Sequence, residues 1–303
     1  MIELWRQRPR ILQKLLFGGI AASRRRVPLY SWLAALALSL PVPAAADITL
    51  VFGTYAADKP TETVRQYKPF LNYLADEMSV VLGEPVKIRM KIAKDYDTGI
   101  GHLADGDVDF ARFGPASYVT VVERNPGIKI VAMESNAGEK RFKGVIAVHS
   151  ESDAHSLADL KDKSFAFGSE LSTIGRYLAQ SHLLDVGIGS ENLSGFEYLG
   201  RHDVVGTAVG AKKFTAGALQ EDTFQKLVKQ GVPIKMLFEF DNVTKPWLAA
   251  SDIDPKVLDA MRQVMLSLHN DEVAASVAKD GFLDGTDSDY DFIRRAMLHS
   301  RDF

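Results

Sequence analysis

The sequence predicts an α/β protein of two lobes joined by a hinge, each lobe built on a mixed, largely parallel β-sheet. Short apolar runs of strand length alternate with amphipathic segments of helix length, which is typical of parallel sheets covered by helices. The 303 residues are enough for two domains of ordinary size. The composition, 46% hydrophobic and 25% charged, is that of a folded globular chain.

The first lobe is expected to begin with a buried strand. Ile48, Leu50 and Phe52 alternate with other residues in this strand, and Gly53 follows them. A helix should start near Thr61, a plausible N-cap, and end before Gly83, because its apolar residues recur every three or four positions. The elements expected next are a strand over 85–92, a helix over 95–104, a strand over 108–113, a helix from Pro115 and a strand over 128–133.

The second lobe is expected to span residues 141–235, inserted into a first lobe made of 47–140 and 236–303. A strand over 234–240 should return the chain to the first lobe, and helices over 255–268 and 271–279 should pack there. The elements expected inside the second lobe are strands over 144–149, 164–167, 196–199 and 216–219, with helices over 156–161, 174–184 and 203–209.

Residues 1–46 have the composition of a secretory signal. Seven basic residues and one acidic residue accompany an apolar run over 27–40, and three alanines end the segment. The run is shorter than the ~20 residues that a membrane-spanning helix needs. We predict export to the periplasm with cleavage before Asp47. The alternative is an uncleaved signal that anchors the protein to the inner membrane.

The chain from Asp47 onward is acidic. The whole chain carries a formal charge of −3, of which the first 46 residues contribute about +6, so the remainder carries about −9. Nucleic-acid binding calls for a basic surface, so this balance argues against a nucleic-acid partner. An anion would be held by local dipoles. The absence of cysteine excludes disulfides, thiolate metal sites and a lipid attached to cysteine.

Three segments share a design that suits a small anion. In each, a strand ends at a glycine and hydroxyl or aromatic residues follow, at 53–55, 114–118 and 168–175. Ligands of open parallel sheets bind beyond the carboxyl ends of the strands, where helix starts expose backbone N–H groups. The segments therefore predict a site for a tetrahedral oxyanion. The alternative is that Ser117, Ser172 and Thr173 are merely helix caps.

These segments resemble motifs of the phosphate/phosphite/phosphonate-binding proteins of ABC transporters, a branch of the type II periplasmic binding proteins. The matching stretches, in family order, are 52–55, 106–110, 113–118, 167–168, 172–175, 200–203 and 245–247. The resemblance implies the type II fold and a solute-binding role. In that role, a ligand in the cleft between the lobes favours the closed form by hinge closure.

The resemblance also implies which residues hold the ligand. The ligand-binding residues would be Tyr55, Tyr118, Ser172, Thr173, Gly175 and His202. The supporting residues would be Thr54, Ser117, Ile174 and Asp203. A tyrosine offers a hydroxyl donor and an apolar wall, and a histidine offers an N–H donor. The alternatives are core packing for each tyrosine and a surface loop for His202.

Two positions depart from the family pattern. Ile174 stands where the family usually has a second serine, so one hydroxyl donor is missing. Thr215 stands where the family usually has an aspartate, which puts recognition of the ammonium group of an aminoalkyl phosphonate in doubt. Three basic residues lie near the motifs and are expected to be solvated surface side chains. These are Arg112, Arg176 and Lys212.

The sequence does not predict an enzyme, a metal site or a cofactor. It contains no His-x-x-x-His pair, no cysteine and no Gly-x-Ser-x-Gly motif. We predict a monomeric solute-binding component of an ABC transporter that delivers a phosphonate or a phosphate- or phosphite-like oxyanion to an inner-membrane permease. The alternatives are a sensor of the same fold that feeds a signalling partner and an exported enzyme such as a transferase.

Overall fold

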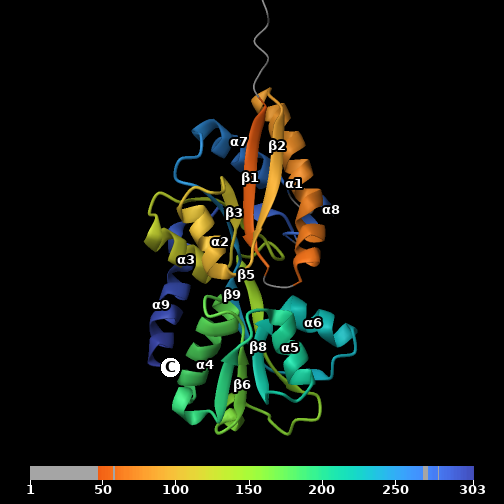
Figure 1. The fold of residues 1–303 in the computed structure, drawn as a ribbon, viewed down its shortest axis with the longest axis vertical. Helices are drawn as coiled ribbons and strands as arrows, with labels where there is room; N and C mark the ends of the chain where they lie inside the picture. The colour runs from red at the N-terminus through yellow and green to blue at the C-terminus, as the bar shows by residue number, and fades with distance from the viewer. Residues whose placement is uncertain (1–46, 57–58, 269–271, 279) are drawn as a thin grey trace, which may run out of the picture. The chain divides into compact units, whose positions relative to one another are not determined.

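The structure is a computed structural model that describes residues 47–56, 59–268, 272–278 and 280–303. The predicted signal, residues 1–46, lies outside the described residues. The described chain forms two mixed β-sheets covered by helices (Figure 1), which confirms the predicted α/β fold class. Within these ranges no helix combines the length and the apolar character that a membrane span requires.

The first sheet has the strand order β11-β4-β10-β3-β1-β2. β1 pairs in parallel with β2 and β3, whereas β10 runs antiparallel between β3 and β4. A strand from late in the sequence thus completes a sheet that the first 134 residues begin. The strands are β1 (Ile48–Tyr55), β2 (Val86–Ala93), β3 (Phe110–Arg112), β4 (Lys129–Glu134), β10 (Pro246–Ala249) and β11 (Phe282–Leu283).

Helices cover both faces of the first sheet because its central strands are apolar on both sides. Phe52 and Trp247 stack at 5.2 Å in the core under α1 and α7, while Phe113 belongs to the core under α2 and α3. The N-cap of α1 is Lys59, so the predicted cap at Thr61 is wrong. The helices are α1 (Pro60–Leu82), α2 (Tyr96–Ala104), α3 (Pro115–Arg124), α7 (Pro255–Ser267) and α8 (Glu272–Ala275).

The second sheet has the strand order β7-β6-β8-β5-β9. β6 pairs in parallel with β7 and β8, and β5 runs antiparallel to β8 and β9. The strands are β5 (Arg141–His149), β6 (Ser164–Phe167), β7 (Gly195–Tyr198), β8 (Ala216–Gln220) and β9 (Ile234–Val243). The helical segments are η2 (Leu157–Leu160), η3 (Thr173–Leu178), α4 (Ala179–Asp185), η4 (Ser190–Asn192), α5 (His202–Gly210) and α6 (Glu221–Lys229).

The strand predicted over 234–240 does not return the chain to the first sheet. β9 pairs with β5 along its whole length, as far as the pair Arg141–Val243, and the return is made by residues 244–245. The predicted limit at 235 therefore falls inside a strand of the second sheet, and the division of the chain into lobes stays a prediction. The C-terminal segments are η5 (Asp287–Tyr290), α9 (Asp291–His299) and η6 (Ser300–Asp302).

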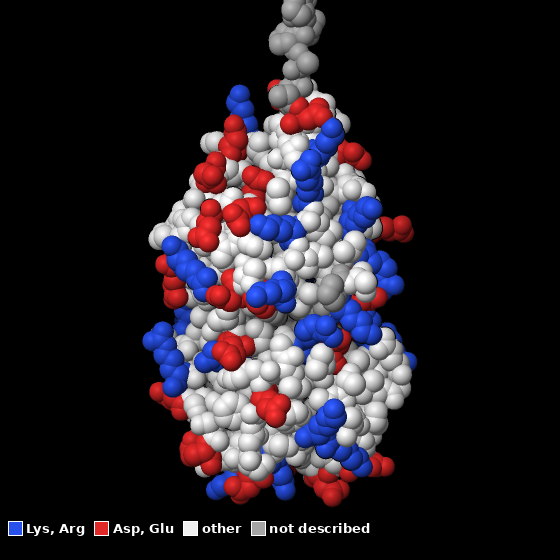
Figure 2. All heavy atoms as spheres, viewed as in Figure 1, with Lys and Arg blue, Asp and Glu red and all other residues white. Residues whose placement is uncertain are grey.

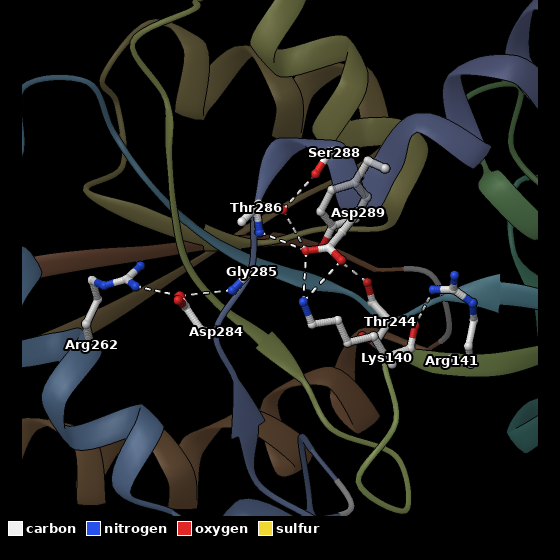
Figure 3. A network of polar contacts seen from close by, with 10 residues as sticks. Lys140, Arg141, Thr244, Arg262, Asp284, Gly285, Thr286, Ser288 and Asp289 are labelled. Carbon is white, nitrogen blue, oxygen red and sulfur yellow. Dashed lines mark hydrogen bonds and ion pairs between the residues drawn. The ribbon is translucent and has the colours of Figure 1, made fainter.

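Two chain segments, the crossing segments, link β4 to β5 and β9 to β10 and lie side by side between the sheets. The Thr244 N–H donates to the Lys140 carbonyl at 3.1 Å, and the Glu134 N–H donates to the Lys245 carbonyl at 3.1 Å. The Lys140 ammonium lies 2.9 Å from the Asp289 carboxylate in η5 (Figure 3). The crossing segments are thus tied to each other and to the C-terminal part of the chain. The C-terminal segment also reaches the second sheet, where the Phe303 ring lies 5.4 Å from that of Phe167 in β6.

Candidate ligand-binding site

A cavity of about 580 Å³ lies where loops of both sheets meet the crossing segments. Its wall includes the ends of β1, β3 and β8, the starts of α3, η3 and α5, and residues of both crossings. The carboxyl ends of β1 and β3 open onto the cavity, as expected for a ligand site in an α/β sheet. This cavity is the place where the geometry brings most of the predicted residues together.

The Tyr55 hydroxyl is fixed at the start of α3. It accepts a hydrogen bond from the Gly114 N–H at 2.7 Å and lies 2.9 Å from the Ser117 hydroxyl oxygen. Its ring stacks on Phe113 at 5.3 Å between centroids. Burial raises the pKa of Tyr55, although the hydrogen bonds with Ser117 and Gly114 oppose that shift. Tyr55 therefore presents a neutral, positioned hydroxyl to the cavity.

Thr173 reaches the same helix start from the second sheet. Its hydroxyl accepts a hydrogen bond from the Ala116 N–H at 2.8 Å. A Cβ atom at Gly114 would lie 3.2 Å from the Tyr55 hydroxyl oxygen and 3.5 Å from that of Thr173. The two hydroxyls are therefore neighbours at the positive end of the α3 dipole, where an anion is favoured.

The loop before η3 holds Thr173 in place through its own hydrogen bonds. The Ser172 hydroxyl accepts the Gly175 N–H at 2.9 Å, and the Gly168 N–H donates to the Gly175 carbonyl at 2.8 Å. Ser172, Thr173 and Ile174 line the cavity. Gly175 does not line the cavity, and its N–H is used inside the loop, so this residue shapes the loop.

His202 and Asp203 open α5 but have different surroundings. His202 is buried and lines the cavity, so it is not the surface residue of the alternative interpretation. The Asp203 carboxylate lies 3.0 Å from the Arg201 guanidinium and holds that side chain. Thr54 also lines the cavity, and its hydroxyl donates to the Arg112 carbonyl at 3.3 Å. Of the predicted supporting residues, Thr54 and Ile174 line the cavity, whereas Ser117 and Asp203 do not.

Tyr118 lies away from the other predicted ligand-binding residues. Its hydroxyl donates to the Asp287 carboxylate at 2.7 Å, and its ring lies 4.5 Å from that of Tyr290. Consecutive residues of a helix point about 100° apart. Since Ser117 faces Tyr55, the next side chain is turned toward η5. Tyr118 therefore packs against the C-terminal segment, outside the cavity wall that the described residues form.

Arg112 is not a solvated surface residue, contrary to expectation. Its guanidinium forms two hydrogen bonds with the Glu134 carboxylate, at 2.6 and 2.9 Å, and both side chains line the cavity. Burial alone would lower the pKa of Arg112, but the Glu134 carboxylate outweighs it and raises the pKa. The reason for the burial is that β10 covers the end of β3 and places Trp247 against Glu134.

The other two basic residues near the motifs do not line the cavity. The Arg176 guanidinium lies over the Tyr177 ring at 4.8 Å, and the exposed Lys212 lies 2.8 Å from Glu151. Thr215 also lies elsewhere, because its hydroxyl contacts that of Ser164 at 3.3 Å. The threonine at position 215 therefore does not decide which groups face the ligand.

Of the charged residues that line the cavity, the sequence analysis singled out Arg112 as a basic residue near the motifs and included Lys245 in a matching stretch, but it did not point to the others. The described cations of the wall are Arg65, Arg112, Lys226 and Lys245, and its described carboxylates are Glu62, Glu134 and Asp222. The wall thus carries a small positive excess in an acidic chain, whereas both signs are interspersed on the face shown in Figure 2. Among the described residues, no three histidine, aspartate or glutamate side chains gather to hold a metal ion.

The sequence matches the model of a family described as "ABC transporter, phosphonate, periplasmic substrate-binding protein" over residues 52–290. The chain belongs to this family. The match confirms the resemblance and the predicted function of a solute-binding component of an ABC transporter.

Relatives of known name are similar to most of the chain. "Probable ABC transporter phosphite binding protein PhnD1" of Prochlorococcus marinus is 26% identical over 60% of this chain and 65% of its own length. "Phosphate-import protein PhnD" of Mycolicibacterium smegmatis is 23% identical over 81% of this chain and 84% of its own. The solved structure of PhnD1 from Prochlorococcus marinus in complex with methylphosphonate has a TM-score of 0.75 at 20% identity, covering 84% of this chain and 99% of that one. This likeness confirms the type II fold.

Proposed function

We propose that the protein captures a phosphonate, or a phosphite- or phosphate-like ion, and delivers it to an inner-membrane permease. The observation that carries this proposal is the meeting of the Tyr55 and Thr173 hydroxyls with the Gly114 and Ala116 N–H groups. Because each hydroxyl oxygen accepts one of these N–H groups, each hydroxyl can donate its own proton to an oxygen of a tetrahedral anion at this helix start. The family and the names of the relatives support the same substrate class.

The binding mechanism is hinge closure. Thr173 opens η3, which follows a strand of the second sheet, whereas Ala116 and Tyr55 belong to elements of the first sheet. A ligand that accepts hydrogen bonds from both sides favours the form in which they are close. The two adjacent crossing segments are the natural hinge, since small changes in their backbone angles would move one sheet relative to the other. Ser172 and His202 are the remaining ligand-binding residues of this proposal, because they line the same cavity.

The protein acts in the periplasm as a monomer and binds its ligand without turnover. Export depends on residues 1–46, whose composition is that of a secretory signal. Amino-terminal sequencing of protein recovered from the periplasm should begin at Asp47. A chain that keeps its first 46 residues in the membrane fraction would instead identify the signal as an anchor.

A thermal-shift screen tests the substrate class. Phosphate, phosphite, methylphosphonate and 2-aminoethylphosphonate should be compared with sulfate at matched ionic strength. A ligand present at a hundred times its Kd stabilises the folded state by about 2.7 kcal/mol, which corresponds to a shift of several degrees. We expect the shift from at least one phosphorus oxyanion and none from sulfate. Adding methanesulfonate and choline to the screen completes the test, because a shift given only by a sulfonate or an organic cation would contradict the proposal.

A further inference from the structure

The cavity is larger than a simple oxyanion needs. An ion of five non-hydrogen atoms such as methylphosphonate fills roughly 100 Å³, a few times the ~30 Å³ share of one water molecule. The cavity measures about 580 Å³. Once an oxyanion lies at the start of α3, much of the cavity therefore remains for its substituent. The side chains around that remaining space decide which substituents fit.

Two neighbouring side chains, one at the end of β9 and one in the second crossing, have polar atoms without partners among the described residues. Asn242 is 1% exposed and Thr244 is 2% exposed, and both line the cavity. Among the described residues, nothing forms a hydrogen bond with the Asn242 amide nitrogen, the Asn242 amide oxygen or the Thr244 hydroxyl. Such atoms are rare in folded proteins, because burying a polar group without a partner is costly.

The position of these residues explains why both face the cavity. They are two apart in the sequence at the end of an extended strand, so their side chains point to the same side, and Val243 between them is buried on the other. Asn242 lies opposite Phe142 in the β5–β9 pair, and the Phe142 ring is also part of the cavity wall. This part of the wall therefore combines an apolar ring with three polar atoms.

We propose that Asn242 and Thr244 form a second polar subsite that binds a hydroxyl group on the substituent of a phosphonate. This inference rests on the proposed function and narrows its substrate class. The subsite offers an amide NH₂ group with two N–H donors, one amide carbonyl acceptor and one hydroxyl that both donates and accepts. A neutral group that both donates and accepts satisfies these atoms, whereas an alkyl chain leaves them unpaired. The preferred ligand is a hydroxyalkyl phosphonate.

Calorimetric titration with two ligands of nearly equal size tests the subsite. The wild-type protein should bind 2-hydroxyethylphosphonate about tenfold more tightly than propylphosphonate, because the site rejects an analogue that leaves its polar atoms unpaired. Thr244→Val and Asn242→Leu should lose this preference while they keep their affinity for propylphosphonate. Thr207→Val, which removes an exposed hydroxyl in α5, should behave as the wild type.

A stability measurement accompanies the titration. Because the substitutions remove buried polar atoms that have no partner, the melting temperature of Asn242→Leu should equal or exceed that of the wild type. The inference is overturned if the wild type binds both ligands equally, or if the preference survives in both variants. If methylphosphonate and propylphosphonate bind but 2-hydroxyethylphosphonate is not preferred over propylphosphonate, only the subsite fails. If no phosphorus oxyanion binds at all, the proposed function fails with it.

Discussion

Tyr55 and Tyr118 follow similar glycine-containing motifs, yet their hydroxyls have different partners. The Tyr55 hydroxyl bonds to the start of α3 at the cavity, whereas the Tyr118 hydroxyl donates to Asp287. The motif places each residue near the end of a strand, but the direction of the side chain depends on its helical phase and on η5, which comes 169 residues later. The sequence therefore indicated the segment correctly and the individual side chain only in part.

The two tyrosines make a matched pair for mutagenesis. Tyr55→Phe removes the acceptor of the partly buried Gly114 N–H and should lower stability by about 1–3 kcal/mol and affinity for the oxyanion by about tenfold. Tyr118→Phe should cost about 1 kcal/mol of stability, because Asp287 is largely exposed, and should leave affinity unchanged. Titration calorimetry and urea unfolding of both variants measure these effects. Equal losses of affinity in the two variants would contradict the separation of their roles.

Other residue roles could not be predicted because they depend on long-range pairing. The local sequence indicates that Arg112 is a surface cation. It belongs to a buried ion pair because β10, which comes much later in the chain, pairs with β3. Asn242 and Thr244 carry no local pattern that distinguishes them from other polar residues of an edge strand. By contrast, Ser172, Thr173 and His202 lie in motifs that the resemblance covers, and all three line the cavity.

At the scale of elements, the loop from Gly168 to Gly175 depends on one close backbone approach. A Cβ atom at Gly175 would lie 2.8 Å from the Gly168 Cα atom and 2.9 Å from the Ser172 hydroxyl. Gly175→Ala should therefore displace the loop, lower stability by about 1–3 kcal/mol and weaken ligand binding. Thermal unfolding and titration calorimetry measure both effects.

Gly101→Ala in α2 is the control for this loop. The nearest atom to a Cβ at Gly101 is 3.9 Å away, so the added methyl group fits. Because alanine favours a helix over glycine by up to about 1 kcal/mol, this variant should be slightly more stable than the wild type and bind normally. A Gly175→Ala variant as stable as Gly101→Ala would contradict the close approach.

The segment η5 should make stability depend on pH. Burial alone would raise the pKa of Asp289, but the Thr286 N–H and the Lys140 ammonium lower the pKa below its ordinary value of about 3.9 (Figure 3). A carboxyl group with a lowered pKa stabilises the folded state above its ordinary pKa, and this stabilisation is lost as pH falls through the folded value.

Urea unfolding at several pH values from about 5 to 3 checks this prediction. The free energy of unfolding of the wild type should fall on acidification, and Asp289→Asn should reduce that fall. The exposed residue Asp105 offers a control, since Asp105→Asn should keep the wild-type pH dependence. An Asp289→Asn variant whose free energy of unfolding falls as much as that of the wild type would show that the Asp289 carboxylate is not the source of the pH dependence.

Most elements could be predicted from the sequence because their signals are local. β6 and the starts of α3 and α7 lie where apolar spacing and proline place them. The helices α6 and α9 were missed, although acidic residues open both and Phe224, Leu227 and Ile293 are buried at helical spacing. Short strands such as β11, with two residues, have no local signal and exist only through pairing.

At the scale of the whole molecule, strand–helix alternation predicted the parallel pairs and not the antiparallel ones. The parallel pairs join β1 to its neighbours and β6 to its neighbours. The antiparallel pairs involve β5, β9, β10 and β11. β5 and β9 are the first and last strands of the second sheet, and β10 and β11 follow them in the chain and join the first sheet. Because these strands carry the chain from one sheet to the other, residues of both crossing segments lie in the cavity wall. A ligand in the cavity would therefore contact the proposed hinge directly.

The most direct test of the account is a titration of methylphosphonate into the wild-type protein and into Thr173→Val. Thr173 joins the second sheet to the start of α3, so loss of its hydroxyl should weaken binding by about tenfold or more. Thr215→Val, at a hydroxyl that contacts Ser164, should bind as the wild type does. Equal affinity of the wild type and Thr173→Val would contradict an oxyanion site at the start of α3.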